Sequence, residues 1–197
     1  MTRFGLGLWV LLGVSTCLFA AGCGRDRCDE SAPDGGTEVD STLLAFLSRA
    51  RAAHHRADLY SDQPARALAV LEEITSGPLP GTPGRRPTEV REVLADTEAR
   101  IASLHSELGH DQEAVTHVQR GLSQLTEDSY FRGHLYEVLG VVEQRRAERL
   151  AKAGQGDLSA QAKERALAAF ERSMEINARV IQKAAPAPTA PKAPADR

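Results

Sequence analysis

The chain has few cysteines and few aromatic residues, and both shortages narrow the ways in which it can fold. It contains 3 cysteines among 197 residues, and aromatic residues make up 5% of the chain. Cys17, Cys23 and Cys28 all lie near the N-terminus. This set offers neither a disulfide framework nor the paired spacing of a structural zinc site. We therefore expect an apolar core to hold the fold together.

The short motifs that indicate catalysis or a bound cofactor are also missing. The sequence has no G-x-S-x-G nucleophile turn and no H-E-x-x-H helix, and the glycine-rich stretch 77–84 lacks the Lys-Ser/Thr pair of a phosphate loop. On a helix, His54 and His55 diverge by about 100°, and His110 and His117 lie two turns apart. We therefore expect no metal site, no cofactor and no enzymatic activity.

Long blocks of one charge sign are absent, and the net charge is −3. A protein whose main partner is a nucleic acid usually presents a basic stripe or a basic run. The composition therefore argues against nucleic acid as the partner.

The first 22 residues have the layout of a secretory signal. Arg3 is followed by an uncharged, mainly apolar stretch at 4–19 and then by the small residues Ala20, Ala21 and Gly22. The apolar stretch is shorter than the ~20 residues that a membrane-spanning helix needs. We therefore interpret residues 1–22 as a signal peptide rather than as a transmembrane anchor.

The run Ala20-Ala21-Gly22-Cys23 resembles the lipobox of bacterial lipoproteins, with Ala20 at a position where leucine is commonest. The resemblance implies that Cys23 becomes the acylated N-terminus and tethers the protein to a membrane. Gly24 follows the cysteine, where an aspartate would signal retention at the inner membrane. The resemblance thus implies an outer-membrane lipoprotein that faces the periplasm. The alternative is an ordinary secretory signal that leaves Cys23 as a free thiol.

The rest of the chain divides into a foldable middle and two polar or proline-rich ends. Residues 23–39 are polar, contain glycine and proline, and are interpreted as a flexible linker. Residues 184–197 form an Ala/Pro-rich tail, which we expect to be disordered because it cannot build a core. Residues 40–183 between them carry the apolar periodicity of a folded domain.

The foldable segment shows helical spacing of apolar residues and no alternating β pattern. We expect Asp62 to cap the second helix and Gly109 to end the third. The predicted class is all-α, with three antiparallel helical hairpins stacked as a short solenoid. The six helices are expected at about 43–60, 63–75, 88–108, 111–125, 130–153 and 157–183.

The second helices of the three hairpins share a pattern in which a small residue precedes a larger one by four positions. The pairs are Ala67 with Leu71, Ala114 with Val118, and Ala166 with Phe170, and the dipeptides Leu108-Gly109 and Leu139-Gly140 add further positions. Together they resemble the tetratricopeptide repeat. The resemblance implies that the small residues let the two helices of a hairpin approach closely and that the larger ones fill the space between hairpins.

The repeats depart from the family in their period, because the marker alanines are 47 and 52 residues apart where the family period is about 34. The alternative is an irregular helical bundle in an alanine-rich chain. Under the repeat interpretation, the first helices line a groove that holds a protein partner. Arg51, His55, Arg100 and His105 are candidate contact positions, with solvated surface as the alternative role for each.

These features predict a lipid-tethered scaffold that binds another protein of the cell envelope and helps to assemble or position a complex. The complex would be of the secretion, pilus, motility or outer-membrane assembly type, which is an inference from architecture. The alternative is an envelope-structural protein that contacts peptidoglycan or polysaccharide and uses the Ala/Pro tail as a spacer.

Overall fold

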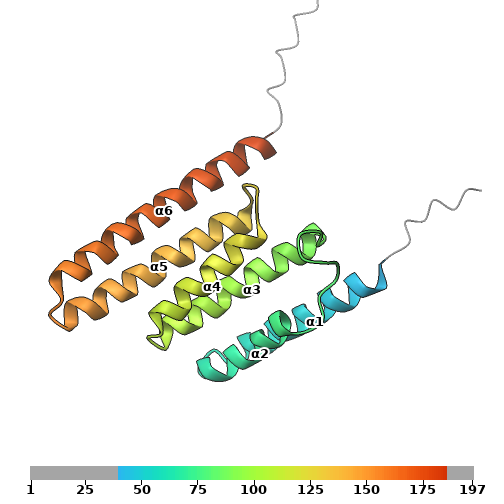
Figure 1. Cartoon of the computed structure of the whole chain (residues 1–197), viewed down its shortest axis with the longest axis horizontal. Helices are drawn as coiled ribbons and strands as arrows, with labels where there is room; N and C mark the ends of the chain where they lie inside the picture. Colours follow the sequence, from blue (N-terminus) through green and yellow to red (C-terminus); the bar gives the residue numbers. More distant parts are fainter. Residues whose placement is uncertain (1–39, 186–197) are drawn as a thin grey trace, which may run out of the picture. The chain divides into compact units, whose positions relative to one another are not determined.

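The computed structural model describes residues 40–185, which form six α-helices and no strand (Figure 1). The prediction of an all-α fold with three helical hairpins is confirmed. The predicted signal peptide (1–22), Cys23, the predicted linker up to residue 39 and residues 186–197 of the predicted tail lie outside the described residues. The helices are α1 (Ser41–Asp58), α2 (Pro64–Ser76), α3 (Thr88–Glu107), α4 (Asp111–Gln124), α5 (Tyr130–Lys152) and α6 (Gly156–Ala184).

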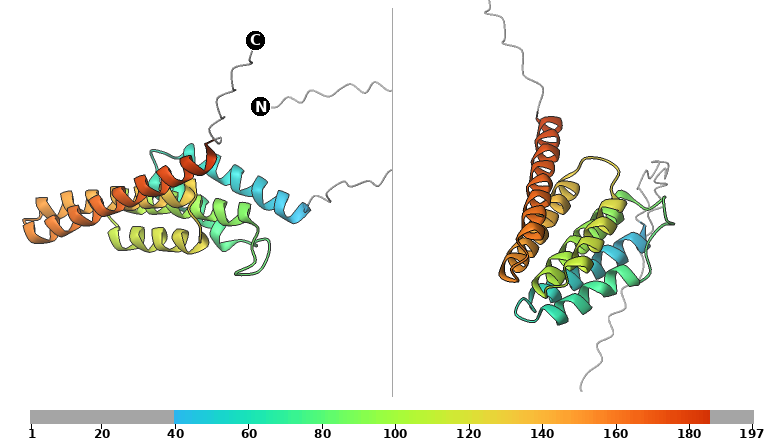
Figure 2. Two further views of the ribbon diagram at one scale, coloured as in Figure 1. Left: turned by 90° about the horizontal axis from the view of Figure 1, so that it is seen from above. Right: turned by 60° about the vertical axis from the view of Figure 1, so that its left-hand side comes forward.

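Consecutive helices pair into the hairpins α1–α2, α3–α4 and α5–α6, which lie side by side (Figures 1 and 2). The first helices form one row, because α3 contacts both α1 and α5. The second helices do not contact one another. Instead, α2 contacts α1 and α3, α4 contacts α3 and α5, and α6 contacts α5 alone. The described part of the chain therefore has one face built mainly by α1, α3 and α5, and an opposite face where α2, α4 and α6 stand apart.

Local sequence signals explain where several helices begin and end. The side chain of Asp40 accepts hydrogen bonds from the backbone amides of Thr42 and Leu43 at 2.9 and 3.2 Å, which caps α1. At the end of α3, Gly109 has φ +81°, and its backbone amide donates to the carbonyl of Ser106. The amide of His110 donates to the carbonyl of His105, which completes a Schellman turn.

The prediction that Asp62 caps α2 is wrong. The residue at the cap position is Gln63, which makes no side-chain capping bond. Pro64 is the first helical residue, and its ring presets a helical φ and removes one amide that would otherwise need a partner. The proline therefore starts this helix without a side-chain cap.

Two apolar clusters hold the hairpins together, and alanine contributes much of both. The first joins α1, α2 and α3, and its larger buried side chains include Phe46, Leu71 and Ile74. The second joins α3, α4 and α5 around Val118 and Leu135. Because alanine side chains are short, these clusters bring helix backbones close together. The buried alanines of the two clusters are Ala50, Ala53, Ala57, Ala67, Ala95, Ala99, Ala102 and Ala114.

In the third hairpin, α6 packs against small residues that recur every seven positions along α5. Gly133, Gly140 and Ala147 are all buried. A Cβ at Gly140 would lie 2.5 Å from Cε1 of Phe170, and a Cβ at Gly133 would overlap the side chain of Asn177. This face of α5 must therefore stay small for the two longest helices to approach each other.

Candidate interaction site

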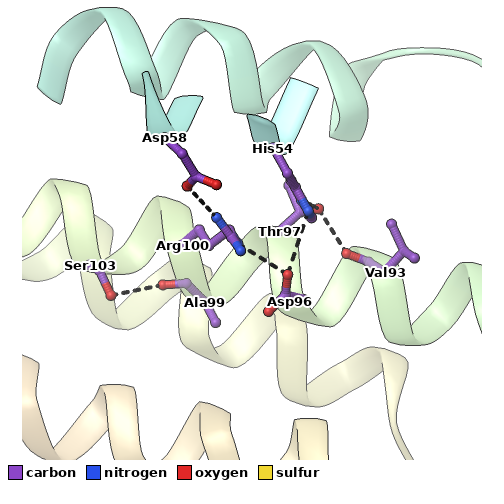
Figure 3. Close-up of polar contacts among 8 residues, drawn as sticks. All are labelled: His54, Asp58, Val93, Asp96, Thr97, Ala99, Arg100 and Ser103. Atoms are coloured by element: carbon purple, nitrogen blue, oxygen red, sulfur yellow. Dashed lines mark hydrogen bonds and ion pairs between the residues drawn. The ribbon is translucent and has the colours of Figure 1, made fainter. Parts of the chain in front are cut away.

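A chain of polar side chains joins α1 to α3 on the face built by the first helices (Figure 3). Nη1 of Arg100 donates to Oδ1 of Asp58 at 2.9 Å, and Nε of the same side chain donates to Oδ2 of Asp96 at 3.1 Å. Nδ1 of His54 lies 3.6 Å from that same Asp96 oxygen. The guanidinium of Arg100 thus bridges two carboxylates on neighbouring hairpins. The helical spacing of four residues within each pair, 54 with 58 and 96 with 100, aligns the four groups.

The hydrogen bonds of Thr97 determine the tautomer of His54. The Thr97 hydroxyl donates to the carbonyl of Val93 at 2.7 Å, so its oxygen is left to accept from Nε2 of His54 at 2.9 Å. The imidazole therefore carries its proton on Nε2 when it is neutral, and Nδ1 turns its lone pair toward Asp96.

Burial holds the pKa of His54 below its ordinary value. Desolvation is the largest cause, and the positive charge of Arg100 lowers the pKa further, while Asp96 and Asp58 raise it. The neutral form is therefore favoured at pH 7.

The order Asp96–His54–Thr97 has the outline of a catalytic triad but not its chemistry. A nucleophilic hydroxyl must be open to substrate and must give its proton to the histidine. Thr97 is completely buried, and its proton is already donated to the Val93 carbonyl. His54 is a donor in this pair, which is the opposite of the general-base role. The cluster therefore links helices and cannot act as a nucleophilic centre.

Two hollows flank the polar chain, and Asp58 borders both. One has a volume of about 330 Å³ and lies along α1, with Arg51, His54 and His55 on its wall. The other has a volume of about 270 Å³ and is bordered by Arg100 and Glu107 of α3 and by residues of α1, α2 and α5. Pockets that hold small ligands have volumes of ~300–1,000 Å³. Both hollows lie near the lower end of this range, so each has room for one or two side chains of a partner or for a small ligand.

The structure places three of the four candidate contact residues at this site and the fourth elsewhere. Arg51 and His55 are exposed on α1 and line a hollow, and Arg100 is the bridging cation. His105 instead turns toward α4, where its ring stacks on that of His117 with centroids 5.0 Å apart. The expectation for His105 is wrong because the periodicity of α3 alone did not show which side α4 would occupy.

A histidine cluster at the α3–α4 hairpin was not anticipated from sequence. His105 contacts His117 by stacking, and its Nδ1 lies 3.4 Å from Nδ1 of His110. Nδ1 of His117 lies 2.6 Å from Oε2 of the buried Glu98. Burial lowers the pKa of His105, and the two neighbouring histidines lower it further. Among residues 40–185, no group of three or more ligating side chains is arranged to hold a metal ion.

The residues singled out by the repeat pattern occupy different environments. Leu108 is 36% exposed beside the Gly109 turn, so it contributes little to the core. Leu139 is only partly buried and faces the side of α4 and α6. Gly140 and Phe170 contact each other. The remaining pattern residues are buried: Ala67, Leu71, Ala114, Val118 and Ala166.

Comparisons of the chain with protein-family models, with curated proteins and with solved structures gave no match. None of the helices between residues 40 and 185 is both long enough and apolar enough to cross a bilayer.

Proposed function

We propose that this protein is a membrane-anchored lipoprotein that binds another protein of the cell envelope and helps to assemble or position a complex. The domain of residues 40–185 acts as the binding module, with hairpins that stack in the manner of tetratricopeptide repeats. The proposal assigns it a scaffolding role without catalysis.

The observation that carries the proposal is the face formed by α1, α3 and α5. Neighbouring first helices there present exposed charged and imidazole groups beside two shallow hollows. Arg51 and His55 project from α1, and the Arg100 bridge keeps α1 and α3 in register. A surface with fixed charges and small recesses suits side chains of a protein partner.

The anchor rests on the sequence around Cys23, whose small preceding residues resemble a lipobox. Acylation at this position would hold the linker and the helical domain at the membrane surface. A single acyl chain gives only marginal attachment, so a firm tether needs more than one. Cys23→Ser should therefore release the protein from the membrane fraction or leave it uncleaved. Fractionation and migration identical to the native protein would refute the lipid anchor.

Binding by the α1–α3–α5 face is tested by cross-linking in membranes followed by solubilisation in detergent and recovery of the tagged chain. The expected result is a stoichiometric protein partner that Arg51→Glu and His55→Glu each reduce at least severalfold. Arg120→Glu is the matched control, because Arg120 is exposed on α4, which is not one of the three helices that form the proposed binding face.

Two outcomes would contradict the proposal. A partner that both α1 variants retain in full would place the interaction elsewhere. Co-sedimentation with purified cell wall, without any protein partner, would favour an envelope-structural role.

A further inference from the structure

A groove lies on the opposite side of the domain, where α4 and α6 both contact α5 but not each other. Its volume is about 500 Å³, larger than the two hollows that flank the polar chain and close to that of a further hollow beside Arg51 and His55 on α1. The floor and walls are mainly apolar, with Tyr136 and Leu139 from α5, Val115 from α4, and Ala168 and Ala169 from α6. Three helices therefore enclose a trough with an open top.

Two arginine side chains of α6 border this groove. Arg165 and Arg172 both border it, and each has a side chain that is nearly half exposed. Seven residues separate them, which is about 10.5 Å along a helix. The cations therefore mark two points along the groove, with the apolar floor between and beside them.

The cation at Arg165 is held in place by a buried acid. Nε and Nη2 of Arg165 each lie 3.0 Å from a different carboxylate oxygen of Glu143, whose side chain is only 5% exposed. This two-point contact with Glu143 fixes the plane of the Arg165 guanidinium. Nη1 of Arg165 takes no part in it. Arg165 can therefore donate a hydrogen bond to a further carboxylate while it stays bound to Glu143.

Arg172 has a weaker internal partner. Nη1 donates to Glu175 at 2.8 Å, in a pair within one helix whose carboxylate side chain is 58% exposed. Exposed pairs of this kind contribute little to stability, because water screens both charges. Arg172 can therefore exchange this contact for a carboxylate that approaches from the groove.

We propose that the α4–α5–α6 groove binds an acidic amphipathic helix of a protein partner. Carboxylates seven residues apart on that helix would reach Arg165 and Arg172, and apolar side chains between them would cover Leu139 and Tyr136. Binding of an apolar helix face in a groove is a common mode of peptide recognition. The inference is independent of the function proposed above, because it concerns the other side of the domain and different residues.

The test uses the full chain in detergent and a synthetic amphipathic helical probe peptide with two glutamates seven positions apart and leucine and alanine between them. Fluorescence anisotropy should show saturable binding. Arg172→Glu should weaken the affinity at least tenfold by reversing a charge at the rim. Ala168→Trp should do the same by filling the groove, and because Ala168 is exposed this change should not disturb the core.

Matched controls separate this site from general attraction to acidic peptides. Arg56→Glu breaks a comparable surface pair with Glu73 on another part of the domain and should leave the affinity unchanged. A probe with glutamines in place of glutamates, or with serines in place of leucines, should bind at least tenfold more weakly. Equal binding by all variants, equal binding of the altered probes, or no binding of the first probe at about 1 mM would each overturn the proposal.

Discussion

The ring of Phe170 lies directly against the backbone of Gly140, at a point where any side chain on α5 would overlap it. The nearest ring carbons would be 2.5–2.7 Å from a Cβ at this position. The contact joins α5 to α6, the two helices of the third hairpin, so it controls how closely they approach each other.

Replacing Gly140 by leucine should destabilise the protein. The added side chain would force Phe170 or the helix backbone to move, at a cost of about 1–3 kcal/mol in the free energy of unfolding. Urea denaturation followed by circular dichroism measures this. Gly156→Ala is the control, because a Cβ there meets no atom within 4 Å. The double change Gly140→Leu with Phe170→Ala should recover part of the loss. Equal stability of Gly140→Leu and Gly156→Ala would show that this contact is not close.

Ala114→Phe should overpack the cluster between α3, α4 and α5. Ala114 is completely buried, so the larger ring has no space without displacement of its neighbours. We expect a loss of about 1–3 kcal/mol in unfolding free energy. Ala69→Phe on the exposed side of α2 should be close to neutral in the same denaturation series. A neutral result for Ala114→Phe would argue against close packing of α4 on α3.

Gly109→Ala should weaken the turn between α3 and α4 through the backbone alone. No atom lies within 4 Å of a Cβ at this position, but the φ of +81° is unfavourable for residues other than glycine. We expect a cost of about 1–2 kcal/mol. Gly109→Asn should cost less, because asparagine tolerates the left-handed region better. If the two variants had the same melting temperature as the native protein, the turn conformation would not matter for stability.

Stability should fall as the pH drops through the region where His54 takes up a proton. The pKa of His54 in the folded protein is lowered from the ordinary 6.5, mainly by burial, so below pH 6.5 the unfolded chain binds more protons than the folded one. The His54 contribution to the unfolding free energy should therefore be fully present above pH 6.5, the ordinary pKa that applies to the unfolded chain, and should decrease as the pH falls from there to the lower pKa of the folded protein. Denaturation should be measured at several pH values between 8 and 5. The unfolding free energy should change less with pH in His54→Gln than in the native protein. His105 contributes in the same direction, because burial lowers its pKa as well. An identical pH profile for His54→Gln would contradict the assignment to His54.

The helices could be predicted from sequence because their ends carry strong local signals. Asp40 caps α1, Gly109 ends α3 in a positive-φ turn, and the prolines between α2 and α3 exclude a continuous helix. These signals act over a few residues and do not depend on the tertiary fold. Asp62 was the exception, because Pro64 alone suffices to start α2.

The site could be predicted only in part, because its geometry depends on which faces of the helices meet. Arg100 was recognised as a candidate contact, but its bridge to Asp58 joins residues 42 positions apart. The contacts of His105 with α4 and the pairing of Glu143 with Arg165 likewise depend on the packing of one helix on another. Helical periodicity places a residue on a face of its own helix, and tertiary contacts decide what that face meets.

The order in which the helices touch has a consequence for how the chain acquires its structure. Every helix–helix contact in residues 40–185 joins elements that are adjacent or next-but-one along the sequence. Such contacts close segments no longer than about one hairpin, which costs less chain entropy than pairing more distant parts of a chain, so folding should be fast. A chain delivered from its N-terminus can complete the α1–α2 pair and add each later helix in turn. The domain could thus mature progressively, without waiting for its last residue to appear.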